Sequence, residues 1–89
     1  MLKETDRAAI REIAAKYGVK RVLLFGSAAD PSREGGDIDL AVEGVPPRRF
    51  FDLYAELISR LTKPVDLVDL EEDSLFVRLV RRDGIPIYG

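Results

Sequence analysis

The chain has 89 residues, which is the size of one small domain, and we treat residues 1–89 as that single domain. Its 14 basic and 16 acidic residues leave a net charge of -2, so the sequence predicts no broad basic surface for nucleic acid. The chain contains no Cys and no His, which excludes disulfides, zinc sites built on those side chains, and His-dependent nucleophilic catalysis. The catalytic groups that remain are carboxylates, hydroxyls, Arg, Lys and backbone, and they favour a hard cation such as Mg²⁺.

Location and assembly follow from the same composition. No apolar run approaches the length of a membrane span, and Met1 leads directly into a charged segment rather than a signal peptide. We therefore expect a cytoplasmic protein with no membrane association. A chain this short buries a modest fraction of its surface, so a partner or a second copy of the chain is expected to stabilise it.

The first half of the chain predicts a helix, a strand and a loop. Residues 4–17 have apolar side chains at helical spacing and are followed by Gly18, a natural stop. Residues 21–25 (RVLLF) are typical of a buried strand. The stretch 27–30 (SAAD) is expected to form one short helical turn, and residues 31–36 a loop.

The second half continues the alternation. Residues 37–42 (DIDLAV) predict a strand, and Pro46–Pro47 begin a helix of about four turns that Pro64 ends. Residues 65–70 (VDLVDL) predict a third strand, 72–82 a last helix, and 85–88 (IPIY) a short edge strand. In the last two helices the side chains expected to face inward are Phe50, Leu53, Tyr54, Leu57, Ile58 and Leu61, then Leu75, Phe76, Leu79 and Val80. The fold class is α/β, with helices packed against one sheet whose strand order stays open.

Two carboxylates lie within the second predicted strand. Because side chains alternate along a strand, Asp37 and Asp39 are expected on one face and Ile38 on the other. Neighbouring buried carboxylates repel each other, and a divalent cation would relieve both the repulsion and the cost of burial. The structural alternative is that these aspartates form an ordinary salt bridge with Arg21 or Arg60.

A third carboxylate is expected from the strand at 65–70. Asp66 and Asp69 are three residues apart and so face opposite sides of the sheet. We assign Asp66 to the site, and we assign Asp69 to a surface or capping role near the last helix.

Gly26 and Ser27 follow the first buried strand directly. Free N–H groups at such a turn can bind an anion, Gly lets a phosphate approach the backbone, and the Ser27 hydroxyl adds a donor. The alternative is a simple turn. Together, a phosphate-binding turn and three carboxylates are the set that metal-assisted nucleotidyl transfer needs.

The combined pattern, G-S-x9-D-x-D followed by an isolated strand aspartate, resembles the DNA polymerase β-type nucleotidyltransferase superfamily. The short chain resembles its minimal branch, the MNT proteins, which are often encoded beside a HEPN-domain partner as antitoxin and toxin. The resemblance covers nearly the whole chain and implies the nucleotidyltransferase fold, an α+β arrangement with a small mixed sheet. A phosphatase of the HAD type also uses D-x-D, but its nucleophile would lie where this chain has Gly26 and Ser27.

The resemblance implies a role for each residue. Gly26 and Ser27 would contact the triphosphate of ATP, Asp37 and Asp39 would hold two Mg²⁺ ions, and Asp66 would bind one metal and help activate the attacking hydroxyl. The implied reaction transfers AMP from ATP to a hydroxyl, for instance a tyrosine of the HEPN partner. The alternative is an inactive antitoxin that neutralises its partner by binding.

Two departures from the family pattern bear on that choice. Asp30 stands where the family often has Arg, and Gly36 stands where it commonly has Ser. Arg33, in the same loop, is the candidate to replace the missing cation.

Overall fold

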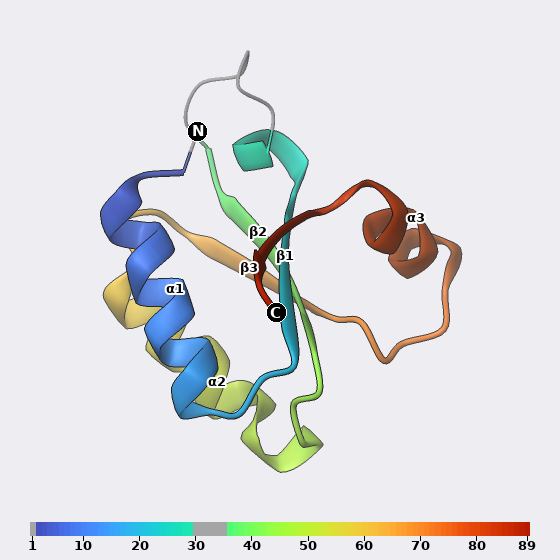
Figure 1. The fold of residues 1–89 in the computed structure, drawn as a ribbon, viewed down its shortest axis with the longest axis horizontal. Helices are drawn as coiled ribbons and strands as arrows, with labels where there is room; N and C mark the ends of the chain where they lie inside the picture. Colours follow the sequence, from blue (N-terminus) through green and yellow to red (C-terminus); the bar gives the residue numbers. More distant parts are fainter. Residues whose placement is uncertain (1, 30–35) are drawn as a thin grey trace.

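The computed structural model describes residues 2–29 and 36–89, which form a four-stranded mixed sheet with the strand order β3-β2-β1-β4 (Figure 1). The strands are β1 (Arg21–Phe25), β2 (Ile38–Glu43), β3 (Val65–Asp69) and β4 (Ile85–Tyr88). Strand β1 pairs antiparallel with both β2 and β4, whereas β2 and β3 are parallel. The α+β fold class is confirmed, and β4 is an edge strand as Pro86 predicted.

Helices α1 (Glu4–Lys16) and α2 (Pro47–Arg60) cover one face of the sheet, while α3 (Leu75–Asp83) lies against the other (Figure 1). The larger core lies under α1 and α2 and takes alternate strand residues, among them Ile38, Leu40 and Val42. The smaller core lies under α3 and contains Leu23, Ala41, Leu70, Val77 and Val80. The two cores follow from strand alternation, because neighbouring residues in β2 point to opposite faces.

Local signals set the ends of the elements. Gly18 follows α1 with a φ of +66°, and Pro47 occupies the first turn of α2. Helix α3 begins later than residue 72, because Ser74 is its N-cap and accepts a hydrogen bond from the Val77 N–H at 3.1 Å. The predicted turn is a short 3₁₀ helix, η1 (Gly26–Ala29), which starts one residue early. The predicted loop at 31–36 lies largely outside the described residues.

Of the four α3 side chains expected to face inward, Val80 is buried, and the expectation is wrong for the other three. Val77 and Val80 are buried, but Leu75, Phe76 and Leu79 are 72%, 52% and 41% exposed. The Ser74 cap and the packing of α3 onto Leu23 and Ala41 select the Val77 side of the helix. Ile58 of α2 is also exposed, because the inward stripe of that helix is narrow and consists of Leu53, Leu57 and the half-buried Phe50 and Tyr54.

One charged side chain lies in the larger core region. Asp6 of α1 is only 2% exposed, and it accepts two hydrogen bonds from Thr62, from the backbone N–H at 3.1 Å and from the hydroxyl at 2.6 Å. A buried carboxylate needs such partners, so this contact fixes the start of α1 to the segment that follows α2.

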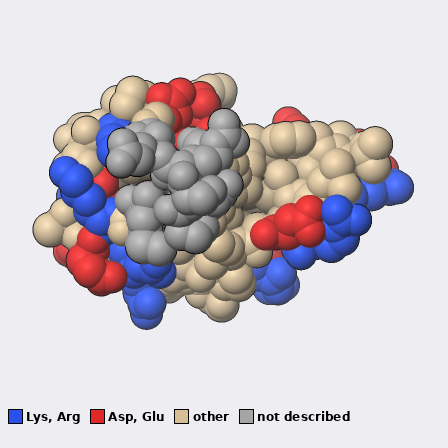
Figure 2. All heavy atoms as spheres, turned by 90° about the horizontal axis from the view of Figure 1, so that it is seen from above, with Lys and Arg blue, Asp and Glu red and all other residues tan. Residues whose placement is uncertain are grey.

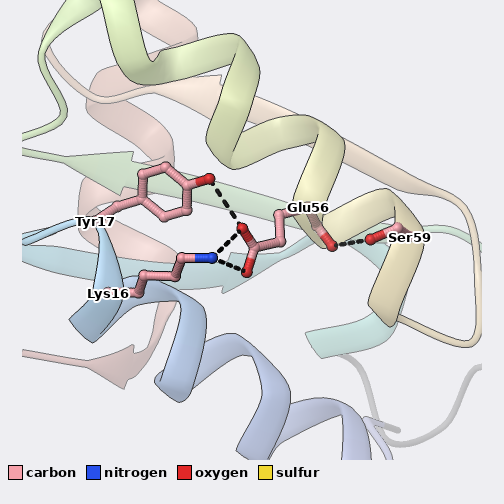
Figure 3. Close-up of polar contacts among 4 residues, drawn as sticks. All are labelled: Lys16, Tyr17, Glu56 and Ser59. Carbon is pink, nitrogen blue, oxygen red and sulfur yellow. Dashed lines mark hydrogen bonds and ion pairs between the residues drawn. The ribbon is translucent and has the colours of Figure 1, made fainter.

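A second polar contact joins the C-terminal end of α1 to α2, at the end of the sheet away from η1 (Figure 3). Glu56 accepts hydrogen bonds from Lys16 Nζ at 2.9 and 3.1 Å and from the Tyr17 hydroxyl at 2.9 Å, while the Ser59 hydroxyl donates to the Glu56 carbonyl at 2.9 Å. The Arg49 guanidinium lies 4.5 Å from the centroid of the Tyr17 ring. Lys16 is exposed and such contacts contribute little to stability, so apolar packing holds α1 against α2.

Candidate active site

Three side chains form a row across the sheet on the face that α3 shares. Phe25 of β1 is the register partner of Asp39 of β2, and Asp39 is the register partner of Asp66 of β3. Residues paired in this way point to the same face. Ile38 and Leu40, on either side of Asp39, are buried in the opposite core and fix the direction of its carboxylate.

Asp39 lies in an environment that disfavours its charge. Partial burial is the largest cause that raises its pKa above the ordinary value of 3.8, followed by the negative charges of Asp66 and then Asp37. A hydrogen bond between the Asp39 and Asp66 side chains raises the pKa further. A divalent cation between two such carboxylates would relieve their repulsion.

Asp37 does not lie in the strand. Strand β2 begins at Ile38, so Asp37 precedes it and is exposed. The predicted strand at 37–42 thus starts one residue later than expected, while the negative charge of Asp37 still acts on Asp39. Within residues 2–29 and 36–89, no three acidic side chains gather closely enough to hold a metal ion. The structure brings Asp39 and Asp66 together and leaves Asp37 beside them.

A pair of facing carboxylates fits Mg²⁺ in particular. Mg²⁺ is usually bound by one or two protein carboxylates, and water and substrate phosphates complete its six ligands. The charge repulsion at Asp39, which a cation would relieve, is the structural feature that supports this fit. Asp39 and Asp66 would hold the ion, with Asp37 close to its edge.

Gly26 forms the floor of the site next to Asp39. Its φ of +72° lies in the left-handed region that favours glycine, and a Cβ at this position would overlap the Asp39 carboxylate. Ser27 is the second residue of η1, directly after this contact. The interpretation of Gly26 and Ser27 as the triphosphate contact stays a prediction, and Arg33 and Asp30 lie outside the described residues.

The alternative that the D-x-D aspartates form a salt bridge with Arg21 or Arg60 is not supported in the described part of the chain. Arg21 pairs with Glu43 at 3.6 Å, and Arg60 pairs with Glu12 at 3.3 Å. Asp69 accepts a hydrogen bond from the Glu71 N–H at 2.9 Å, which is a turn contact, while Ser74 caps α3. Asp69 therefore has the local backbone role expected of it, though not as the N-cap.

Phe25 is a neighbour of the site that the sequence did not indicate. The sequence predicts only that Phe25 belongs to a buried strand, whereas the register of β1 and β2 places Phe25 directly opposite Asp39. The alternation within RVLLF does separate Leu23 and Phe25 from Val22 and Leu24. The sequence holds no signal for the register between β1 and β2, which decides the neighbour.

Residues 8–89 match the model of a family described as polymerase beta, nucleotidyltransferase. The chain belongs to this family. The resemblance inferred from G-S-x9-D-x-D is thus confirmed, and with it the nucleotidyltransferase fold of the sheet and helices. A search of curated proteins found no match.

Solved structures of similar fold come from toxin–antitoxin complexes. One is a toxin–antitoxin crystal structure with AMP-PNP, which is 27% identical with a TM-score of 0.77, and the match covers 93% of this chain and 73% of that one. Another is the toxin–antitoxin MntA-HepT, which is 25% identical with a TM-score of 0.73, and the match covers 98% of this chain and 73% of that one. A mutant of that complex is 26% identical with a TM-score of 0.75. These similarities fit the minimal nucleotidyltransferase branch.

Proposed function

We propose that this family member is a Mg²⁺-dependent nucleotidyltransferase that transfers AMP from ATP to a hydroxyl, and that it acts as the antitoxin of a HEPN-type toxin. The acceptor we propose is a tyrosine of that toxin. We place the reaction in the cytoplasm, where ATP and Mg²⁺ are available.

The observation that carries this proposal is the pair Asp39 and Asp66 beside Gly26. The two carboxylates face each other in register, and burial and mutual repulsion raise the pKa of Asp39. Repelling carboxylates next to a glycine turn are suited to a cation and a triphosphate, and they offer little to a purely structural role.

Each residue has a defined task in this reaction. Bound Mg²⁺ would supply positive charge to the phosphates of ATP. Asp39 and Asp66 hold the cation, and Asp66, exposed on the edge strand β3, accepts the proton of the attacking hydroxyl. Gly26 lets the triphosphate approach the backbone of η1. The hydroxyl oxygen bonds to the α-phosphorus, the bond to the β-phosphate oxygen breaks, and pyrophosphate leaves.

The comparisons support the choice of nucleotide and of partner. One similar structure contains AMP-PNP, an ATP analogue, and all three are toxin–antitoxin complexes. A domain of this size has little room for an acceptor site of its own, which favours an acceptor carried by a partner protein.

The test is the intact mass of the toxin encoded beside this chain after incubation with this protein, ATP and Mg²⁺. We expect the toxin to gain the mass of one or more AMP units. The same reaction with an Asp37→Asn/Asp39→Asn double variant should give no gain. A gain that persists in the purified, folded double variant would refute the catalytic proposal.

A second candidate function is neutralisation by binding alone. It is favoured by the lack of a three-carboxylate cluster in the described ranges and by Asp30 at the position where the family often has Arg. In that case Asp39→Asn should still bind and silence the toxin. A toxin that stays active beside the folded variant would exclude this candidate.

A further inference from the structure

A pocket of about 360 Å³ lies directly beside the carboxylate pair. Gly26 belongs to both, because a Cβ on this residue would overlap the Asp39 carboxylate and the residue also lines the pocket. Phe25, the register partner of Asp39, lines it too. Paired residues on adjacent strands are about 5 Å apart, so the pocket begins within one side chain of the proposed phosphate site.

The wall opposite Phe25 comes from α3 and is apolar. Phe76 packs edge-to-face on Phe25 with ring centroids 5.6 Å apart at 76°, and Leu79 continues the wall. In the view of Figure 2, the right-hand part of the molecule, where α3 lies, is largely uncharged, and charged side chains gather along its lower edge. A T-shaped pair leaves at least one ring face free, and that face can stack on a flat ligand.

The exposure of this wall needs an explanation. Phe76 is 52% exposed and Leu79 is 41% exposed, although Val77 and Val80 of the same helix are buried. Neither residue belongs to the smaller core under α3, which takes Val77 and Val80 from this helix. A contiguous exposed apolar patch that lines a pocket is typical of a binding site.

The pocket is not wholly apolar. Asp83 lines it, and Arg82 donates to both Asp83 carboxylate oxygens at 2.9 Å. Each carboxylate oxygen has a second lone pair, so Asp83 can still accept a hydrogen bond from an amino group. The pocket therefore borders the carboxylate pair through Phe25 and Gly26, and its lining combines an apolar wall with a hydrogen-bond acceptor.

We propose that this pocket binds the nucleoside part of the substrate, and that it takes a purine with an exocyclic amino group stacked on Phe76. This proposal rests on the proposed function, since it needs the triphosphate at Gly26. It gives the exposed apolar side of α3 a role in nucleotide recognition.

The experiment compares two ligands by calorimetry on the full chain with Mg²⁺, namely ATP and inorganic tripolyphosphate. The wild-type protein should bind ATP more tightly than tripolyphosphate, and it should bind ATP more tightly than UTP. Phe76→Ala should weaken ATP binding by about 5- to 150-fold, the range measured for stacking of one base on an aromatic ring, and should leave tripolyphosphate binding unchanged.

Two further variants separate the pocket from folding. Phe76→Leu keeps an apolar side chain without a stacking face and should lose part of the ATP affinity. Phe51→Ala removes a side chain that is 76% exposed on α2, away from this pocket, and should change neither affinity. Thermal unfolding of each variant shows whether the fold is retained.

Each other outcome overturns a defined claim. Equal affinity of the wild-type protein for ATP and tripolyphosphate would exclude a nucleoside pocket while leaving the phosphate site in place. Unchanged ATP binding in Phe76→Ala together with loss of toxin binding would assign this surface to the partner instead. Equal binding of UTP and ATP would refute the purine preference. A wild-type protein that binds neither ATP nor tripolyphosphate would contradict the proposed function itself.

Discussion

Gly26 lies so close to the carboxylate of Asp39 that a Cβ on Gly26 would overlap it, so a larger residue at this position has to displace that side chain. The contact links the turn after the first strand to the carboxylate in the second. It makes Gly26 the residue on which both the backbone turn and the position of Asp39 depend.

Gly26→Ala tests this contact. The φ of +72° costs an alanine about 1 kcal/mol, and the overlap with Asp39 adds to that cost and moves the carboxylate. We expect lower stability and at least about a tenfold loss of AMP transfer, measured by unfolding and by the mass assay.

Gly18→Ala is the matched control for that variant. Gly18 has a similar φ of +66°, but a Cβ there meets nothing within 4 Å. Gly18→Ala should lose stability only through the cost of its positive φ, and it should transfer AMP at the wild-type rate. Equal losses of transfer in the two variants would contradict the role of the Asp39 contact.

The pKa of Asp39 predicts a pH dependence of stability in the absence of metal. Because its pKa is raised on folding, the folded protein retains a proton that the unfolded chain loses above its ordinary pKa of 3.8. The stability that comes from this retained proton is fully present below the pKa of Asp39 in the unfolded chain. It is lost as the pH rises through the pKa of Asp39 in the folded protein. In EDTA, Asp39→Asn should therefore unfold at a higher temperature than the wild type at pH 7, and the difference should shrink toward pH 4.

Mg²⁺ and the variant Asp37→Asn serve as controls for this comparison of melting temperatures. Addition of Mg²⁺ should raise the melting temperature of the wild type and have little effect on Asp39→Asn. Asp37→Asn, an exposed change outside the strand, should stabilise the protein less in EDTA. A wild-type protein that is more stable than Asp39→Asn at pH 7 in EDTA would show that the two carboxylates do not repel each other.

Asp66 and Asp69 provide an internal comparison within β3. Asp66 faces the site, and Asp69 lies on the other face with a backbone contact to Glu71. Asp66→Asn should lower the rate of AMP transfer by about 100-fold or more, because it removes a metal ligand and the proton acceptor. Asp69→Asn should retain transfer, and a loss of similar size there would mean that the wrong aspartate has been assigned.

The buried contact between Asp6 and Thr62 predicts a stability effect far from the site. Thr62→Val removes the hydroxyl that donates to Asp6 at 2.6 Å and leaves a buried carboxylate with one partner fewer. We expect a loss of about 1–3 kcal/mol in the free energy of unfolding, measured with urea, and no change in ATP affinity. Glu4→Gln, at an exposed residue of the same helix, should stay close to the wild type.

Much of this protein follows from the sequence because it depends on local signals. The helical spacing before Gly18, the prolines at 46, 47 and 64, and the spacing of Gly26, Asp39 and Asp66 predict the elements and the family. These signals depend only on residues that are close in the sequence or at a fixed spacing. They can therefore be recognised without knowledge of which strands pair.

The tertiary structure decided what depends on neighbours. The register of β1 against β2 places Phe25 beside Asp39, and the parallel pairing with β3 places Asp66 on its other side. The start of β2 at Ile38 leaves Asp37 outside the strand, and the Ser74 cap turns Phe76 and Leu79 toward the pocket rather than the core. A one-residue change in strand register moves every side chain of the strand to the other face of the sheet, and only contacts between distant segments fix the register.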